Sequence, residues 1–165
     1  MTLEAITKEC QKVAAAEGVE ITVPIELNGR FRSCLGRVSY KWADMACTKV
    51  VPTKIEFSKI YVANASDEQV IQTCIHEVTH YIISVKTGCR HGHDKMFKAL
   101  NKKLGGDGSR LATVDRTVMK PKYTVYCKTC GAIVGNHYRM CKTVKYPNLY
   151  RSKCCNGELR VEQNY

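Results

Sequence analysis

The strongest constraint on the fold is the sequence HEVTH at residues 76–80, because its chemistry requires an α-helix. Two histidines four residues apart differ by only about 40° around a helix axis, so both imidazoles can hold one metal ion. Glu77 then lies where it can act as general base on a water molecule whose pKa the metal lowers to about 7. The motif predicts a zinc-dependent peptidase site, with His76 and His80 as ligands.

The surrounding residues predict a well-delimited helix. Ser66 and Gln69 fit a capping box, so the helix is expected to begin near Asp67. Gly88 provides a stop at its C-terminal end. Its expected apolar face consists of Val70, Ile71, Cys74, Ile75, Val78, Ile82 and Val85. Burying two histidines and a glutamate for packing alone would be costly, which favours the catalytic interpretation.

A catalytic zinc site normally has three protein ligands, so a third one is needed. The metzincin pattern would place a histidine six residues after His80, but that residue is Lys86. The stretch 81–108 contains no Glu, but it contains His91 and His93. His93 precedes a segment expected to be helical, whereas the simplest interpretation of His91 is an exposed loop residue. The apolar stripe of that second helix is Met96, Phe97, Leu100 and Leu104.

The motif HEVTH, followed by a short loop and GHDKMF, resembles the SprT-like, or Spartan-type, zinc metalloproteases. The resemblance implies that His93, thirteen residues after His80, is preferred to His91 as the third ligand. It implies zinc bound by His76, His80 and His93, and catalysis by Glu77.

Three further features bear on this resemblance. Phe97 matches the aromatic residue four positions after the third histidine. Asp94 departs from the glycine that the family often has there, and it could instead cap the second helix. Upstream, a strand ending in Ile60-Tyr61-Val62 is expected to lead into the HEVTH helix.

The expected fold class is α+β: a minimal zincin-like metalloprotease core over residues 1–118, with a small sheet packed on helices, and a small β zinc-ribbon-like hairpin module over 119–165. The expected early elements are a helix over 3–17, a strand over 19–27, a hairpin turn at Asn28-Gly29, and strands over 31–42 and 54–62. An edge strand beside the zinc could receive an extended substrate peptide by backbone pairing.

The second motif is the CxxC knuckle of Cys127 and Cys130, followed by Gly131. Together with Cys155 it looks like a zinc ribbon, which the resemblance also implies. A second CxxC would require a cysteine where this chain has Ser152.

The fourth ribbon ligand is open on sequence alone. Cys154 is one candidate, although adjacent cysteines tend to point apart, and Cys141 and His137 are others. The sequence predicts a second, structural zinc bound by Cys127, Cys130 and Cys155, with Cys154 named as the fourth ligand and Cys141 and His137 kept as alternatives.

The chain shows no N-terminal signal segment and no apolar run of membrane-spanning length, so the cytoplasm of a bacterium or of a phage-infected host is expected. In a reducing compartment, CxxC favours metal over a disulfide. The remaining cysteines are expected to be small buried hydrophobes: Cys10, Cys34, Cys47, Cys74 and Cys89, although the role of Cys89 stays open because it lies near the third ligand.

The net charge of +11 indicates a polyanionic partner. The last part of the chain carries Lys120, Lys122, Lys128, Arg139, Lys142, Lys145, Arg151, Lys153 and Arg160 against Glu158 and Glu162. The tyrosines that could stack on bases are Tyr123, Tyr126, Tyr138, Tyr146 and Tyr150. We expect a monomeric zinc metallopeptidase that cleaves DNA-associated or DNA-crosslinked proteins. The alternative is a zinc-ribbon nucleic-acid-binding protein with a non-catalytic core.

Overall fold

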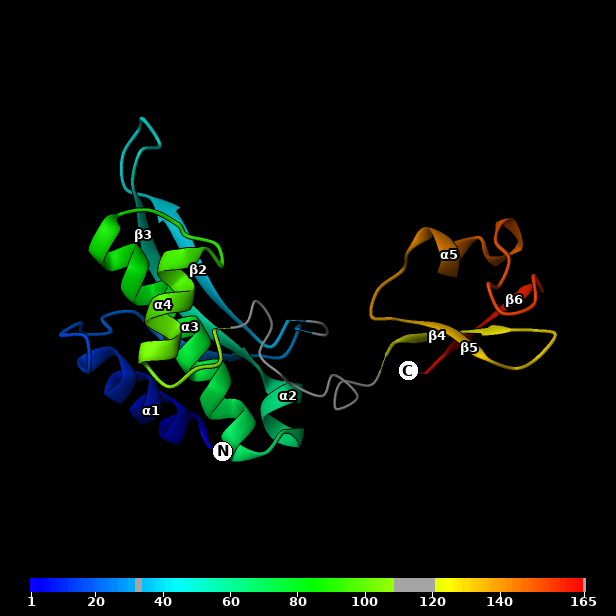
Figure 1. The fold of residues 1–165 in the computed structure, drawn as a ribbon, viewed down its shortest axis with the longest axis horizontal. Coiled ribbons are helices and arrows are strands. Elements are labelled where there is room, and N and C mark those ends of the chain that lie inside the picture. Colours follow the sequence, from blue (N-terminus) through cyan, green and yellow to red (C-terminus); the bar gives the residue numbers. More distant parts are fainter. Residues whose placement is uncertain (32–33, 109–120, 165) are drawn as a thin grey trace. The chain divides into compact units, whose positions relative to one another are not determined.

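The computed structural model describes residues 1–31, 34–108 and 121–164. The chain divides into two compact units, residues 1–118 and 119–165 (Figure 1). The boundary predicted after residue 118 lies outside the described residues. The α+β class is confirmed: helices with a small mixed sheet make up the first unit, and a small antiparallel β module with a four-cysteine cluster makes up the second.

Four helices are described in the N-terminal unit: α1 (Leu3–Ala15), α2 (Lys59–Asn64), α3 (Asp67–Thr87) and α4 (Lys95–Lys103). The Thr2 side chain caps α1, and the chain leaves this helix through Gly18, which has a φ of 66°. The helix therefore ends two residues before the predicted Glu17. Its buried face packs against α3 and consists of Ile6, Cys10, Val13 and Ala14.

The sheet of this unit has the strand order β1-β3-β2, with β1 (Ile25–Asn28), β2 (Gly36–Trp42) and β3 (Val50–Ser58). β1 is parallel to β3 and β2 is antiparallel to it. The hairpin turn predicted at Asn28-Gly29 is wrong, since β1 pairs with β3 and not with β2. The Asn28 side chain explains this, because it accepts a hydrogen bond from the Arg30 N–H at 2.8 Å and donates one to Glu56 at 2.8 Å, which turns the chain away from β1.

The prediction that Ile60-Tyr61-Val62 ends a strand is also wrong, because these residues lie in α2. Ser58 ends β3, and its hydroxyl accepts a hydrogen bond from the Tyr61 N–H at 3.3 Å. Capping by Ser58 therefore starts a helix at the point where apolar content alone suggested a continuing strand. Tyr61 and Val62 are nevertheless buried, so their apolar character serves the core.

Helix α3 begins at Asp67 behind the predicted capping box of Ser66 and Gln69, both of whose hydrogen bonds are present. It stops at Gly88, which is left-handed with a φ of 68°. Most of the predicted apolar face is buried, but Val85 is 46% exposed. That prediction was wrong because Val85 follows the last buried turn, residues 81–84, and borders a cavity.

The C-terminal unit is a three-stranded antiparallel sheet with the order β5-β4-β6. Its elements are β4 (Tyr123–Cys127), β5 (Ile133–His137), α5 (Lys142–Lys145), the 3-10 helix η2 (Pro147–Leu149) and β6 (Leu159–Gln163). The core is small and contains Tyr123, Val125, Val144 and Leu159. Within the three described stretches of the chain, no helix is apolar enough over a sufficient length to cross a membrane.

Candidate metal centres

The three histidines predicted from the sequence meet in the N-terminal unit. His76 and His80 lie one turn apart on α3, and His93 lies in the segment before α4. The His93 Nε2 atom is 3.0 Å from His76 Nε2 and 3.3 Å from His80 Nε2. A nitrogen from each ring therefore points toward one common location.

This spacing fits a shared metal ion better than hydrogen bonds between the rings. A neutral His93 Nε2 is either a donor or an acceptor, so it satisfies the two neighbouring nitrogens only if their tautomers match. Three ligands at zinc–nitrogen distances of 2.0–2.1 Å in tetrahedral geometry would be about 3.3 Å apart. The observed distances of 3.0 and 3.3 Å are close to this value.

The protonation of the helix histidines suits metal binding. Burial, together with a smaller effect of the neighbouring histidines, lowers the pKa of His76 to about 4 and that of His80 to about 3. Both imidazoles are thus neutral near pH 7, which is the form that binds metal. The donor set fits zinc, because zinc accepts three imidazole nitrogens and leaves a fourth position open.

Phe97 supports the cluster from α4. Its ring centroid lies 4.9 Å from that of His76, 4.3 Å from that of His80 and 4.8 Å from that of His93. The Phe97 side chain is fully buried, so its packing against the three imidazoles restricts their movement.

His91, the alternative third ligand, is engaged elsewhere. Its Nδ1 atom is 2.7 Å from Asp94 Oδ2. The other carboxylate oxygen of Asp94 accepts a hydrogen bond from the Phe97 N–H at 2.9 Å, so Asp94 caps α4. The residue that departs from the family pattern therefore starts the helix that carries Phe97.

Glu77 projects toward β2 and is 7% exposed. Burial raises the pKa of Glu77 to about 8, although a hydrogen bond from the Val38 N–H and the charge of Arg37 oppose the rise. A bound divalent cation would also oppose it. Glu77 lines a cavity of about 270 Å³ together with His76, His80 and His93.

β2 is an edge strand of the sheet and forms one wall of that cavity through Gly36, Arg37, Val38 and Tyr40. Sequence reasoning anticipated an edge strand near the zinc without being able to say which one. A Cβ at Gly36 would lie 2.6 Å from Glu77 Cγ, so only glycine lets β2 approach this closely. The role of Gly36 was not predicted, because a single glycine in the sequence does not indicate which side chain packs against it.

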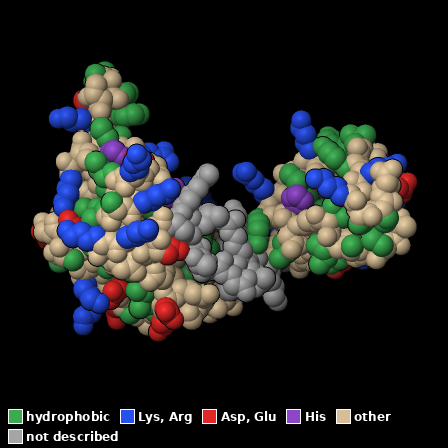
Figure 2. All heavy atoms as spheres, in the orientation of Figure 1, with side chains coloured by type: hydrophobic (Ala, Val, Ile, Leu, Met, Phe, Trp, Pro, Cys, Tyr) green, Lys and Arg blue, Asp and Glu red, His purple; other side chains and the backbone are tan. Residues whose placement is uncertain are grey.

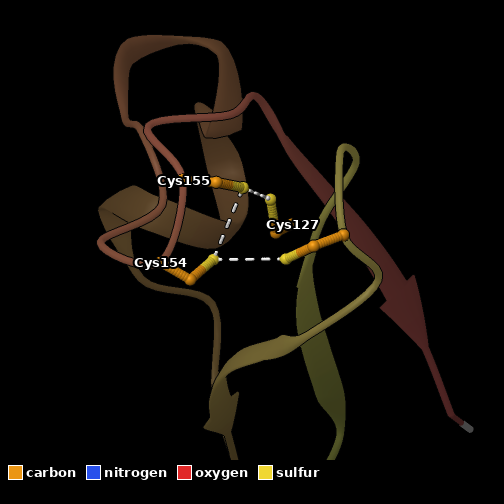
Figure 3. Close-up of side chains that lie close together, drawn as sticks. Cys127, Cys154 and Cys155 are labelled. Carbon is orange, nitrogen blue, oxygen red and sulfur yellow. Dashed lines mark hydrogen bonds between the residues drawn. The ribbon is translucent and has the colours of Figure 1, made fainter.

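The C-terminal unit brings four cysteines together: Cys127, Cys130, Cys154 and Cys155. Figure 3 shows the labelled thiols of Cys127, Cys154 and Cys155 directed toward one another. The Sγ–Sγ distances are 3.3 Å for Cys127–Cys155, 3.4 Å for Cys130–Cys154 and 3.8 Å for Cys154–Cys155. All four are free thiols. Tetrahedral zinc would place its sulfur ligands about 3.8 Å apart, so the set fits such an ion.

Two adjacent cysteines can serve this cluster because residues 152–157 form a tight loop. The Ser152 carbonyl accepts a hydrogen bond from the Asn156 N–H at 3.0 Å, and Asn156 has a left-handed φ of 53°. Gly157 then passes close to the first knuckle, where a Cβ would lie 2.9 Å from Cys127 Sγ.

Ser152 lies where the resemblance would place a cysteine, and it has a different role. Its hydroxyl is buried, donates to Cys127 Sγ at 3.1 Å and accepts from the Gly157 N–H at 3.0 Å. The Ser152 hydroxyl is the main reason that the pKa of Cys127 is lowered to about 5. From the sequence, Ser152 was noted only as the position where a second CxxC would need a cysteine.

The remaining cysteines vary in burial. Cys10 and Cys74 are buried as predicted, Cys34 is half-buried, and Cys47 and Cys89 are exposed, contrary to expectation. Their exposure follows from their positions in a turn and after the α3 C-cap.

The other candidates for the fourth ribbon ligand form a separate pair. Cys141 Sγ lies 3.3 Å from His137 Nδ1. Within the described residues, neither belongs to the four-cysteine group.

Comparison with known proteins adds one match. Residues 3–117 match the model of the SprT-like family. The match covers the three histidines and Glu77 and ends before the cysteine cluster. Among curated proteins, no similar sequence was found.

Proposed function

The chain belongs to the SprT-like family, and from this premise we propose that it is a zinc-dependent metallopeptidase with Glu77 as its general base. The observation that carries the proposal is that nitrogens of three histidines converge in a cavity where Glu77 is the one carboxylate among the described lining residues. His76, Glu77 and His80 lie on the capped helix α3, and His93 directly precedes Asp94, the N-cap of α4, so the arrangement is held before substrate binds.

In this proposal the chain holds zinc through His76, His80 and His93. When bound, zinc would supply a Lewis acid that polarises a peptide carbonyl and acidifies a water molecule. Glu77 accepts the proton of the attacking water and then delivers it to the leaving amine. Val38 holds the Glu77 carboxylate through its backbone N–H, which keeps the base directed into the cavity.

We further propose that β2 receives the substrate as an added strand. Among the described residues it is an edge strand, so one side of it pairs with no other strand and can add an extended peptide. Gly36 and Val38 lie beside Glu77, so in this proposal the bond to be cleaved lies next to this part of β2. Such a site selects unfolded or extended segments rather than folded surfaces.

We also propose that the substrates are DNA-associated proteins. Figure 2 shows Lys and Arg side chains lying between hydrophobic ones on the visible face of the C-terminal unit. Tyr146 and Tyr150 are exposed, so they are available to stack on bases. Tyr123, which the sequence also suggested for stacking, is instead buried in the core.

The peptidase proposal is tested by comparing wild type with Glu77→Gln on an unfolded basic protein, with and without a chelator. We expect chelator-sensitive fragments from wild type, none from Glu77→Gln, and equal zinc content in the two proteins. Glu4→Gln on the exposed face of α1 is a matched control and should cleave like wild type. Wild-type activity in Glu77→Gln would refute the proposed base.

The DNA proposal is tested separately by gel shift at several salt concentrations. Replacing Lys142 and Lys153 with Glu should weaken DNA binding and reduce its salt dependence. The matched control replaces Lys8 and Lys98, two exposed lysines of the N-terminal unit, and should change binding less. DNA binding without any chelator-sensitive cleavage would favour the alternative, a nucleic-acid-binding protein with a non-catalytic core.

A further inference from the structure

The cavity over the histidine cluster has an uneven distribution of charge. Two of its lining residues are cationic, Arg37 and Arg90, and Glu77 is the acidic residue among them. The Glu77 side chain is buried, so the positive charges dominate the accessible part of this wall.

Arg37 and Arg90 differ in how far their charges are already compensated. An Arg37 guanidinium nitrogen lies 3.2 Å from the buried Glu56 carboxylate, so the charge of Arg37 is largely compensated by this ion pair. Arg90 is exposed in the segment between α3 and α4, and among the described residues it makes no ion pair. Its guanidinium carbon lies 5.9 Å from the centre of the Tyr40 ring. The charge of Arg90 is therefore available to an anion that enters the cavity.

The position of Tyr40 relates Arg90 to the proposed substrate path. Tyr40 is two residues after Val38 on β2, or about 7 Å along the strand. Val38 contacts Glu77 and so marks the bond to be cleaved. A substrate side chain within two residues of that bond would then lie opposite Tyr40 and within reach of Arg90.

A second hollow that His76 also lines has the opposite character. It has a volume of about 390 Å³, and its charged lining residues are Glu68 and Asp107, with no Lys or Arg among the residues that line it within the described chain. An anionic side chain would be repelled from this hollow. The two hollows therefore carry opposite charge, which favours binding of a peptide with an acidic side chain in the cavity that Arg90 lines.

We propose that Arg90 is a specificity-determining residue that binds an acidic side chain of the substrate, located within two residues of the bond to be cleaved. The inference rests on the proposed peptidase function. A carboxylate would accept charge-assisted hydrogen bonds from the guanidinium, which Tyr40 holds over the cavity. Because Arg90 is exposed, its replacement should leave the fold intact.

The test first maps a bond that wild type cleaves in an unfolded protein. Short peptides spanning that bond are then compared with Glu, Gln or Lys at each of the two positions on either side. For wild type we expect Glu to raise kcat/KM over Gln at one of these positions by about fivefold, the upper range for a partly exposed ion pair. Arg90→Ala should lose this preference, Arg90→Lys should retain part of it, and Arg90→Glu should prefer Lys. Lys8→Glu, a matched charge change on α1, should keep the wild-type preference.

The outcomes separate this inference from the proposed function. If wild type cleaves nothing in a chelator-sensitive manner, the peptidase proposal itself fails. If wild type cleaves but shows no preference for Glu, or if Arg90→Ala keeps that preference, only the role of Arg90 is overturned. An equal loss of kcat for all peptides in Arg90→Ala also overturns it, because specificity requires a change that depends on the substrate.

Discussion

Gly36 on β2 lies directly against the side chain of Glu77 on α3, so that a Cβ added at Gly36 would be 2.6 Å from Glu77 Cγ and 2.9 Å from its Oε1 atom. A side chain at this position would occupy the space that the carboxyl group needs. The conformation of the proposed base thus depends on the absence of a side chain in a neighbouring strand, 41 positions earlier in the sequence.

Gly36→Ala is expected to lower kcat/KM by about 100-fold or more, since a displacement of about 1 Å at a catalytic group has an effect of this size. The extra methyl forces the Glu77 side chain or β2 to move, whereas the side chains of His76, His80 and His93 keep their positions. Zinc content should therefore stay at the wild-type level while peptide cleavage falls. Both are measured on the same preparations, by metal analysis and by peptide hydrolysis.

Gly29→Ala is the matched control, because nothing lies within 4 Å of a Cβ at that position. It should cleave like wild type. Equal activities of Gly36→Ala and Gly29→Ala would contradict the importance of the contact between Gly36 and Glu77.

His93→Ala should remove zinc from the histidine cluster, and His91→Ala should not. The His93 Nε2 atom is within 3.3 Å of the corresponding atoms of His76 and His80, whereas the His91 side chain is hydrogen-bonded to Asp94. We expect His93→Ala to weaken zinc binding at this cluster by more than about 100-fold, because removing a ligand exceeds the 10–100-fold effect of removing a supporting partner. Zinc titration monitored by competition with a coloured chelator gives the affinity. Greater zinc loss in His91→Ala than in His93→Ala would reassign the third ligand.

The sequence predicted the local features of the site well and the long-range ones poorly. The capping box at Ser66, the stop at Gly88 and the cap at Asp94 depend on residues a few positions apart, so the pattern contains the needed information. The pairing of β1 with β3 and the contact between Gly36 and Glu77 depend on segments far apart in the sequence. No local propensity specifies such contacts, which is why the Asn28-Gly29 hairpin was predicted wrongly.

The ligands of the cysteine cluster could not be predicted from cysteine spacing, for a different reason. Ser152 and Cys154 differ by two positions, and spacing alone favoured a ligand at position 152. The left-handed Asn156 and the bonds made by Ser152 create a loop that carries Cys154 and Cys155 to the same place. A rule based on the spacing of CxxC pairs does not contain this geometry.

Cys154→Ser should therefore release the metal of the C-terminal unit, whereas Ser152→Ala should only weaken its binding by about 10–100-fold, the effect expected for losing a hydrogen bond to a ligand. The Ser152 hydroxyl is the main contributor to the low pKa of Cys127, and without it the thiolate forms less readily. Cobalt substitution followed by visible spectroscopy reports thiolate ligation directly. Equal retention of thiolate-bound cobalt in Cys154→Ser and wild type would exclude Cys154 as a ligand.

Glu56 is a buried carboxylate in the central strand β3. It accepts hydrogen bonds from Lys54 and Asn28, each at 2.8 Å, and from Arg37 and Ser39, each at 3.2 Å. Burial alone would raise the pKa of Glu56, but these four donors outweigh it and lower the pKa from 4.5 to about 2.

Because the folded-state pKa lies below the unfolded one, Glu56 contributes stability that is fully present above about pH 4.5 and is lost as the pH falls toward 2. Glu56→Gln should lower the free energy of unfolding at pH 7 by about 1–3 kcal/mol, since it removes a charged acceptor from a buried network. The difference between wild type and Glu56→Gln should shrink as the pH falls from 5 to 2, because protonation of wild-type Glu56 removes the same charge. Urea unfolding at a series of pH values, with chelator present so that metal binding adds nothing, measures this difference. Glu4→Gln on exposed α1 should show a much smaller difference at every pH, and a Glu56→Gln difference that stays constant or grows on acidification would contradict the assigned role of the network.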